Sequence, residues 1–372
     1  MSASKNILVA PLNWGIGHAC RCVPIINELL DLGHEVILGS DGESLTYLKK
    51  EFPLLKSIKL PSYSIEYPAE GKHFKLKLIK DSPKIWSALR KEHQILKVIV
   101  KKHKLDLVIS DNRLGLFSTH VKTIFITHQL HVLSGNTTWL STHLHNYFIK
   151  KFDQCWVPDF DDSLLSGRLS ALKDSSINYK FIGPLSRFEK TSHPHKKYDL
   201  LILLSGPEPQ RSILEKRLLL NLKNYKQKVL FIAGKMEQTQ IVRKTGALTY
   251  YNFLTQNGLQ KAFDRSDVVI CRSGYSTIMD LYKLEKKAFF IPTPGQFEQE
   301  YLANHFHELR IAPFIEQHKF NLSHLEKLKD YTGFGSQFCC SISSSTSMSL
   351  ILEELFSSVN ENSEPIPTSL ST

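Results

Sequence analysis

Residues 271–299, which read CRSGYSTIMDLYKLEKKAFFIPTPGQFEQ, decide the fold of this chain. The β-branched run at 268–270 that leads into them is typical of a buried strand, and the Arg-Ser-Gly turn at 272–274 ends it. A helix is expected to begin near Ser276 and Thr277, and the apolar run at 289–291 predicts a second strand that two prolines then stop. This order predicts the repeating unit of a parallel α/β sheet.

The two loops of this unit carry polar groups at the sheet edge where ligands bind in such folds. The start of the helix leaves backbone N–H groups unpaired and has a positive dipole end, which favours an anion such as a diphosphate. The second loop holds Gln296, Glu298 and Gln299, whose side chains can hydrogen-bond the hydroxyls of a sugar. An ordinary connection between strands has the same pattern, so both interpretations stay open.

The composition indicates an intracellular protein of two domains. The chain has 372 residues, and 47 lysines and arginines against 36 aspartates and glutamates leave a net charge of +11. These cations are spread along the chain without zinc-finger spacing or a ribonucleoprotein motif, so no nucleic-acid partner is expected. No apolar stretch approaches the roughly 18 residues of a membrane span. We expect a cytoplasmic protein, with peripheral contact at the inner face of the membrane as an open alternative.

The alternation of strands and helices restarts midway along the chain, which predicts an α/β fold of two Rossmann-like domains. Residues 1–188 are expected to form the N-terminal domain, residues 189–197 a polar linker, and residues 198–342 the C-terminal domain. A helix over 343–356 is expected to pack back on the N-terminal domain. Residues 357–372 are rich in Ser, Pro and Glu and are expected to be disordered.

A glycine-bearing loop at 13–21, which we expect to precede a helix over 23–32, is the second candidate site. Gly15 and Gly17 let the backbone approach a ligand, and His18 is suited to act as a general base. Arg21 is expected to contact an anion. A dinucleotide fingerprint would need a third glycine where Cys20 stands, so no nicotinamide cofactor is predicted. A structural role for His18 is the alternative.

Further polar side chains are expected at the same sheet edge, after two predicted strands. Asp111 follows the strand at 105–110, and His128 follows the strand at 123–127. The chain has several other histidines near position 128, but without the spacing of a zinc site, so no metal is predicted. The cysteines at 20 and 22 are expected to fill packing space rather than to act as nucleophiles, and reduced thiols are expected throughout.

Residues 63–104 mix aromatic and basic side chains, and from residue 83 onward they predict a long amphipathic helix. One interpretation is a helix whose polar face is simply solvated. The other is a surface for anionic lipid or for a phosphorylated acceptor. The sequence leaves both open.

Residues 250–304 resemble the C-terminal domain of glycosyltransferase family 28, whose best-known member completes the lipid-linked peptidoglycan precursor. The resemblance runs without a gap from the segment at 250–254 through Arg-Ser-Gly to the polar loop and the following Asn304. The motif Gly-x-Gly-His-x-x-Arg at 15–21 resembles the acceptor-side loop of the family, and also that of related nucleotide-sugar hydrolases.

The resemblance implies a GT-B fold, in which a nucleotide sugar binds the C-terminal domain and an acceptor binds the N-terminal domain across a cleft. It implies no cofactor and no metal, with a UDP-sugar as the donor substrate. The acceptor side would comprise the catalytic base His18 together with Gly15, Gly17, Arg21, Asp111 and His128. The donor side would comprise Ser205 and Gly206, Phe253 at the uracil, Arg272, Ser273, Gly274, Ser276 and Thr277 at the diphosphate, Asp280 at the ribose, and Gln296, Glu298 and Gln299 at the sugar.

Several positions depart from the family pattern. Asp280 stands in place of a glutamate, Glu300 in place of a second glutamine, and Glu208 would face a diphosphate with a like charge. The predicted activity is inverting, metal-independent transfer of a hexose or N-acetylhexosamine from a UDP-sugar to a hydroxyl acceptor, such as a lipid-linked or cell-envelope glycan. The alternatives are a UDP-sugar hydrolase on the same fold and a non-catalytic nucleotide-sugar-binding protein. The donor sugar, acceptor, linkage and oligomeric state stay open.

Overall fold

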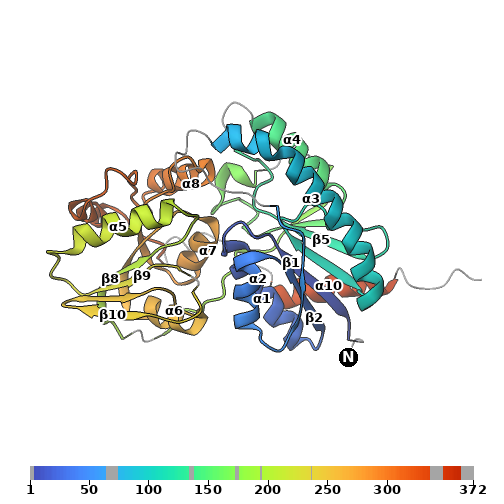
Figure 1. Cartoon of the computed structure of the whole chain (residues 1–372), viewed down its shortest axis with the longest axis horizontal. Helices are drawn as coiled ribbons and strands as arrows, with labels where there is room; N and C mark the ends of the chain where they lie inside the picture. The colour runs from blue at the N-terminus through green and yellow to red at the C-terminus, as the bar shows by residue number, and fades with distance from the viewer. Residues whose placement is uncertain are drawn as a thin grey trace, which may run out of the picture.

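The computed structural model describes residues 4–63, 74–133, 138–171, 176–192, 195–235, 237–335 and 347–361. Figure 1 shows two α/β domains side by side, one from each half of the chain. The predicted pair of Rossmann-like domains is therefore confirmed.

The N-terminal domain is built on a seven-stranded sheet in which every neighbouring pair is parallel. Its strand order is β3-β2-β1-β4-β5-β6-β7. The strands β1 to β3 therefore follow one another toward one edge of the sheet, and β4 to β7 follow one another toward the other edge. The strands are β1 (Asn6–Pro11), β2 (Glu35–Ser40), β3 (Lys56–Lys59), β4 (Leu107–Asp111), β5 (Lys122–Ile126), β6 (Gln154–Val157) and β7 (Tyr179–Phe181). The helices are α1 (Gly17–Asp31), α2 (Gly42–Glu51), α3 (Phe74–His103) and α4 (Thr138–Ile149), with a short 3₁₀ turn η3 (Gly167–Leu169).

The C-terminal domain has a six-stranded sheet in the order β10-β11-β9-β8-β12-β13. All neighbours are parallel except β10, which forms an antiparallel edge with β11. The strands are β8 (Tyr198–Leu203), β9 (Val229–Ile232), β10 (Val242–Thr245), β11 (Leu248–Tyr251), β12 (Ser266–Cys271) and β13 (Lys287–Phe290). The helices are α5 (Gln210–Leu222), α6 (Gln256–Asp264), α7 (Tyr275–Lys283), α8 (Phe297–Glu308) and η4 (Leu322–Asp330). The last helix, α10 (Met348–Glu361), lies with the N-terminal domain (Figure 1).

Several helices differ from the sequence prediction in where they begin or end; α3, for example, begins at Phe74 rather than at residue 83. Helix α1 begins at Gly17, because the N–H of Cys20 already bonds to the carbonyl of Ile16, and the loop before it is shorter than expected. Helix α8 begins at Phe297, so most of the predicted polar loop is helical. Helix α10 continues to Glu361, whereas disorder was predicted from residue 357; residues 362–372 lie outside the described residues.

The two domains share one apolar core. A single cluster of buried side chains includes Ala19 of α1, Leu185 of the connecting segment and Ile278 of α7. Helix α10 joins the same cluster through Ile351 and packs against α1. This packing places the amino-terminal ends of α1 and α7 against each other, as Figure 1 shows between the domains.

Candidate active site

The first half of the site is a buried cluster at the carboxyl ends of β1 and β4. Asp111, the last residue of β4, is fully buried and lies 2.8 Å from Nδ1 of His18 on the first turn of α1. Arg21, one turn further along α1, donates to both oxygens of Asp111 through Nε and Nη2. The predicted residues His18, Arg21 and Asp111 thus meet at one point.

The hydrogen-bond partners assign the proton on His18. A carboxylate only accepts hydrogen bonds, so the tautomer that suits the shorter contact has its hydrogen on Nδ1 and donates it to Asp111; Nη2 of Arg21, 3.0 Å from the same Nδ1, bonds to Asp111 instead. Nε2 is then the unprotonated nitrogen, and in the described part of the chain it has no hydrogen-bond partner. The His18 side chain is 14% exposed, so it can be reached from solvent. This arrangement is suited to accepting a proton.

Neighbouring side chains keep the carboxyl group of Asp111 ionised. Burial by itself would raise its pKa, but Arg21 and His18 outweigh burial and hold the pKa well below its ordinary value. Arg21 is almost fully buried and committed to this carboxylate. Arg21 thus fixes Asp111, and its expected contact with a ligand anion remains a prediction.

A second histidine extends the cluster to the other domain. Nη1 of Arg21 lies 3.1 Å from Nδ1 of His128, and Nε2 of His128 lies 3.0 Å from Oε1 of Glu298 on α8. Because arginine only donates, His128 accepts at Nδ1 and donates from Nε2 to Glu298. Gln129 also donates to Glu298, and the His128 ring stacks on Tyr275 of α7 at 4.0 Å between centroids. The network links the two domains.

The titration of this second pair is set by burial and by the ion partners. Burial lowers the pKa of His128, which outweighs the opposing effect of Glu298. Burial would raise the pKa of Glu298, but His128, His18 and Arg21 together outweigh burial and lower it. Glu298, whose side chain is 31% exposed, thus pairs with His128 of the N-terminal domain, and its contact with a sugar remains a prediction.

The predicted donor side is built around the start of α7. Gly274 is the N-cap residue, and a Cβ added to it would meet nothing within 4 Å, so the turn is open. Oγ of Ser276 donates to the carbonyl of Gly17, and Oγ of Ser273 donates to the carbonyl of Gln299. Of the hydroxyls predicted to bind a diphosphate, Ser276 therefore contacts α1 of the other domain and Ser273 contacts α8 of its own domain, while Thr277 lies in the first turn of α7.

Arg272 is fully buried, and its guanidinium bonds to neutral groups. It donates to the carbonyls of Ile291, Pro292 and Gln210 and to the side chain of Gln317. Within the described residues no carboxylate pairs with it, and its Nε has no partner. Burial lowers its pKa to about 9. Arg272 thus lies behind the turn as a buried positive charge, and its contact with a diphosphate remains a prediction.

Asp280 and Phe253 lie in contacts between the domains. Asp280 is buried and accepts from Ser186 at 2.8 Å, and burial raises its pKa to about 6. The ring of Phe253 lies under Nζ of Lys50, an N-terminal-domain residue, at 4.7 Å. The carbonyl of Phe253 accepts from the side chain of Gln240. The ribose and uracil contacts predicted at these two positions remain predictions.

The turn after β8 and the start of α8 complete the predicted set. Gly206 has a positive φ of 101°, a conformation in which a side chain would be strained, and it follows Ser205. Glu208 binds Arg211 and Ser212 of its own helix, so its charge is partly compensated and the repulsion raised by the sequence is reduced. Gln296 is the N-cap residue of α8.

Gln299 has a role that the sequence did not indicate. Its side-chain oxygen accepts from the N–H of Thr293, and its carbonyl accepts from Ser273, so it ties the end of β13 to the start of α7. The hydroxyl of Thr293 is buried and has no partner in the described part of the chain. Gln129, Tyr275 and Thr293 were all missed, since the only signal for them is their position beside the motifs.

The cysteines near the site are unsuited to nucleophilic chemistry, as the sequence predicted. Cys20 and Cys22 are both buried. Burial raises the pKa of the Cys20 thiol to about 11 and holds that of Cys22 well above its ordinary value. Both thiols are therefore protonated near neutral pH.

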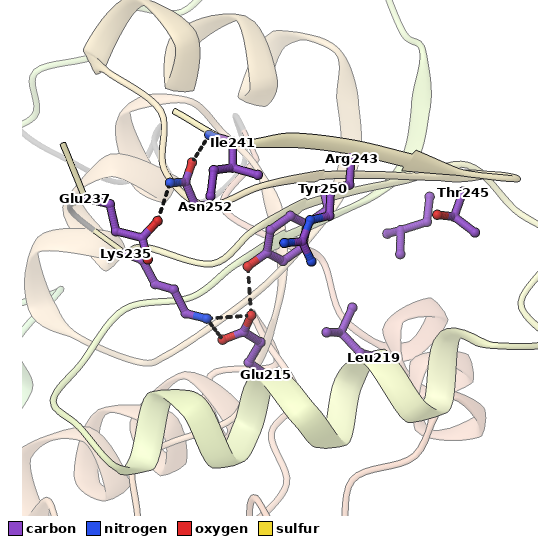
Figure 2. A pocket seen from close by; sticks show the side chains of 10 residues that line it. Glu215, Leu219, Lys235, Glu237, Ile241, Arg243, Thr245, Tyr250 and Asn252 are labelled. Carbon is purple, nitrogen blue, oxygen red and sulfur yellow. Dashed lines mark hydrogen bonds and ion pairs between the residues drawn. The ribbon is translucent and has the colours of Figure 1, made fainter. Parts of the chain in front are cut away.

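Figure 2 shows a separate pocket of about 280 Å³ in the C-terminal domain, between α5 and the β10–β11 edge. Its polar groups satisfy one another: Glu215 pairs with Lys235 and accepts from Tyr250 at 2.8 Å, and Asn252 donates to Glu237. Its lining includes none of the predicted site residues.

Comparison with known proteins supports the fold and the enzyme class. Residues 210–331 match the glycosyltransferase family 28 C-terminal domain. An uncharacterized glycosyltransferase of Methanosarcina mazei is 26% identical over 322 residues, which are 79% of this chain and 82% of that protein.

Two solved structures have the same fold over nearly their whole length. The spinosyn forosaminyltransferase SpnP is 13% identical with a TM-score of 0.65 and covers 96% of this chain and 100% of its own. The glycosyltransferase VinC, solved in complex with dTDP, is 11% identical with a TM-score of 0.59 and covers 96% and 100%. The chain is thus a glycosyltransferase of the GT-B fold, and its residues 210–331 match the family 28 C-terminal domain.

Proposed function

We propose that the protein transfers a sugar from a UDP-sugar to a hydroxyl acceptor with inversion at the anomeric carbon and without a metal. The observation that carries this proposal is the contact of His18 with Asp111 directly opposite the start of α7. It pairs a proton acceptor in one domain with an anion-favouring helix end in the other. An acceptor hydroxyl and a donor diphosphate would meet between them.

The reaction requires one proton transfer and one displacement. Nε2 of His18 takes the proton of the acceptor hydroxyl while the hydroxyl oxygen forms a bond to the anomeric carbon. The bond from that carbon to the β-phosphate oxygen breaks on the opposite face, and UDP leaves with the electron pair. Asp111 keeps Nδ1 protonated and stabilises the imidazolium that forms, while Arg21 fixes Asp111.

The leaving diphosphate needs positive charge, which the C-terminal domain supplies. The first turn of α7 presents backbone N–H groups, and Arg272 behind it is a buried cation that lacks a carboxylate partner in the described residues. A buried unpaired charge is costly, so a bound anion would stabilise this region. The dTDP bound by VinC supports a nucleoside diphosphate as the ligand class.

The donor and acceptor classes follow from the family resemblance. A hexose or N-acetylhexosamine is the proposed sugar, and a lipid-linked or cell-envelope glycan is the proposed acceptor. A cytoplasmic enzyme would meet both the UDP-sugar pool and such an acceptor at the membrane surface.

The test compares the wild-type protein with His18→Ala. Titration calorimetry with UDP, GDP and dTDP measures nucleotide preference, and a panel of UDP-sugars with lipid-linked acceptors measures transfer. We expect tight binding of UDP by both proteins and transfer by the wild type only. Undiminished transfer by His18→Ala would disprove the assignment of His18 as the base. Stoichiometric release of free sugar from the UDP-sugar in the absence of an acceptor would show that the protein is a hydrolase rather than a transferase.

A further inference from the structure

Two neighbouring residues at the start of α8 face different parts of the site. Helix α8 lies on the side of the C-terminal domain that adjoins the N-terminal domain (Figure 1), and Oε1 of Glu298 lies 3.0 Å from Nε2 of His128 across that boundary. The side chain of Gln299 accepts from the N–H of Thr293, and its carbonyl accepts from Ser273 beside the start of α7. The first turn of α8 therefore connects the proposed donor turn to a histidine of the acceptor side.

The ring of His128 is held in one plane and in one direction. It stacks on Tyr275 with the two ring planes 9° apart. Within that plane Nδ1 lies 3.1 Å from Nη1 of Arg21, and Nε2 points to Glu298. Burial lowers the pKa of His128, so the ring is neutral near pH 7 and carries a single hydrogen.

The position of that hydrogen decides whether Arg21 can keep its place. Arginine has only donors, so Nη1 needs Nδ1 of His128 as an acceptor, and the ring hydrogen must then be on Nε2. Glu298 accepts this hydrogen, and Gln129 donates to the other oxygen of the same carboxylate. Without Glu298 the hydrogen is free to move to Nδ1, where it would point at an N–H of Arg21. Two donors would then face each other, which would loosen Arg21 from Asp111.

We propose that Glu298 is a positioning residue for the base His18 and that it acts through His128. It holds the ring hydrogen of His128 on Nε2, which leaves Nδ1 free to accept from Arg21. Arg21 in turn fixes Asp111, the partner of His18. Because Glu298 belongs to the C-terminal domain, the base is complete only when the two domains are docked. The acceptor hydroxyl is then activated only beside the donor half of the site.

A second contact between the same parts supports this coupling. Oγ of Ser276, on the first turn of α7, donates at 3.0 Å to the carbonyl of Gly17, which directly precedes His18. Both connections attach the base to the region where the diphosphate is proposed to bind. The kinetic consequence rests on the proposed function. The effect of Glu298 on the ring hydrogen of His128 does not, and it is measured without a substrate.

The first experiment records nitrogen NMR spectra of the histidine rings in the full chain without any ligand, and the resonances of His128 are assigned by their loss in His128→Gln. We expect the hydrogen on Nε2 in the wild type and a mixture of both tautomers in Glu298→Ala. Glu298→Gln should keep the wild-type tautomer, because its amide oxygen still accepts from Nε2. A wild-type ring with its hydrogen on Nδ1, or an unchanged ring in Glu298→Ala, would overturn the proposal.

The second experiment measures transfer by the same variants. Glu298→Ala should lower kcat by about tenfold or more, which is part of the roughly 10²–10⁴ that a general base contributes. The affinity for UDP and the KM for the UDP-sugar should be unchanged, and Glu298→Gln should recover most of the rate. The matched control is Glu308→Ala, which removes an exposed carboxylate at the far end of the same helix and should leave both the rate and the His128 ring unchanged.

Circular dichroism verifies that each variant is folded, and Glu298→Ser replaces Glu298→Ala if that variant is not. A raised KM for the UDP-sugar with wild-type kcat would overturn the proposal in favour of a contact between Glu298 and the sugar. An equal loss of kcat in Glu308→Ala would overturn it as well. A wild type that transfers no sugar would refute the proposed function alone, and the spectra would then decide the role of Glu298 by themselves.

Discussion

Replacing Asp111 with asparagine tests how the base is oriented, because it removes one charge and changes almost no volume. The asparagine amide would offer one oxygen and one NH₂ group where the native carboxylate has two acceptors. Nε and Nη2 of Arg21 and Nδ1 of His18 all depend on those acceptors. The variant should therefore lose both catalytic rate and stability.

The magnitudes follow from burial. Arg21 and Asp111 are almost entirely buried, and removing one partner of a buried pair costs about 3–5 kcal/mol of folding free energy. Orientation of a general base contributes about 10²–10⁴ in rate, so kcat should fall by that factor while the affinity for UDP is retained. Urea denaturation measures the first quantity, and transfer assays with calorimetry measure the second.

A double variant separates the two effects. Arg21→Met in the Asp111→Asn background removes the unpaired cation, so most of the lost stability should return. The transfer rate should stay low, because His18 still lacks a carboxylate on Nδ1. Wild-type kcat in Asp111→Asn, or recovery of rate together with stability in the double variant, would refute this account of the base.

The stability of the native pair also depends on pH. Asp111 has a folded pKa below its unfolded value, so its contribution is present above the unfolded pKa and lost as pH falls through the folded pKa. Acid unfolding of the wild type should therefore be steeper than that of the double variant, which lacks this group.

Three further perturbations test other parts of the site. Gly17→Ala places a Cβ 2.8 Å from Oγ of Ser276, so it should lower the melting temperature, and adding Ser276→Ala should restore most of the loss. Folding raises the pKa of Asp280 from 3.8 to about 6. At a pH above about 6 this shift lowers the free energy of unfolding by about 3 kcal/mol. The free energy of unfolding should fall as pH rises from 4 to about 6 in the wild type but not in Asp280→Asn. At neutral pH this variant should have a higher melting temperature than the wild type and should bind UDP more weakly. Cys20, buried with a pKa of about 11, should react with maleimide in the native state far more slowly than in urea, as peptide mass spectrometry will show; equal rates would contradict its burial.

The fold could be predicted because both halves carry a strong local signal. Short β-branched runs ending in glycine or proline turns identify the strands, and parallel strands bring their carboxyl ends to one edge. This reasoning correctly predicted that Asp111 and the glycine loop would lie together. The start of α1 was missed because Ile16 provides no side-chain cap and Pro24 lies inside the helix. Both features are atypical of helix starts.

The pairing of charges could not be predicted in the same way. Arg21 and Arg272 were each expected to bind a ligand anion, but Arg21 lies against Asp111, and Arg272 lies among carbonyl groups. Glu298 reaches His128 from the other domain, across 170 positions of sequence. Such partners depend on how two separately folded sheets approach each other, and no local pattern in one sequence encodes that approach.

The apolar cluster shared by α1, α7, α10 and the connecting segment has a consequence for how the halves can be exchanged. Tyr275, Ile278 and Met279 of α7 pack in the same core as Val23 and Ile26 of α1. In a chimera that carries the C-terminal half of a relative, the grafted half would have to preserve this apolar packing as well as the active-site contacts. Changing the donor by recombination therefore requires the interface residues to be transferred with it, and thermal unfolding of the intact chain should be one cooperative transition rather than two.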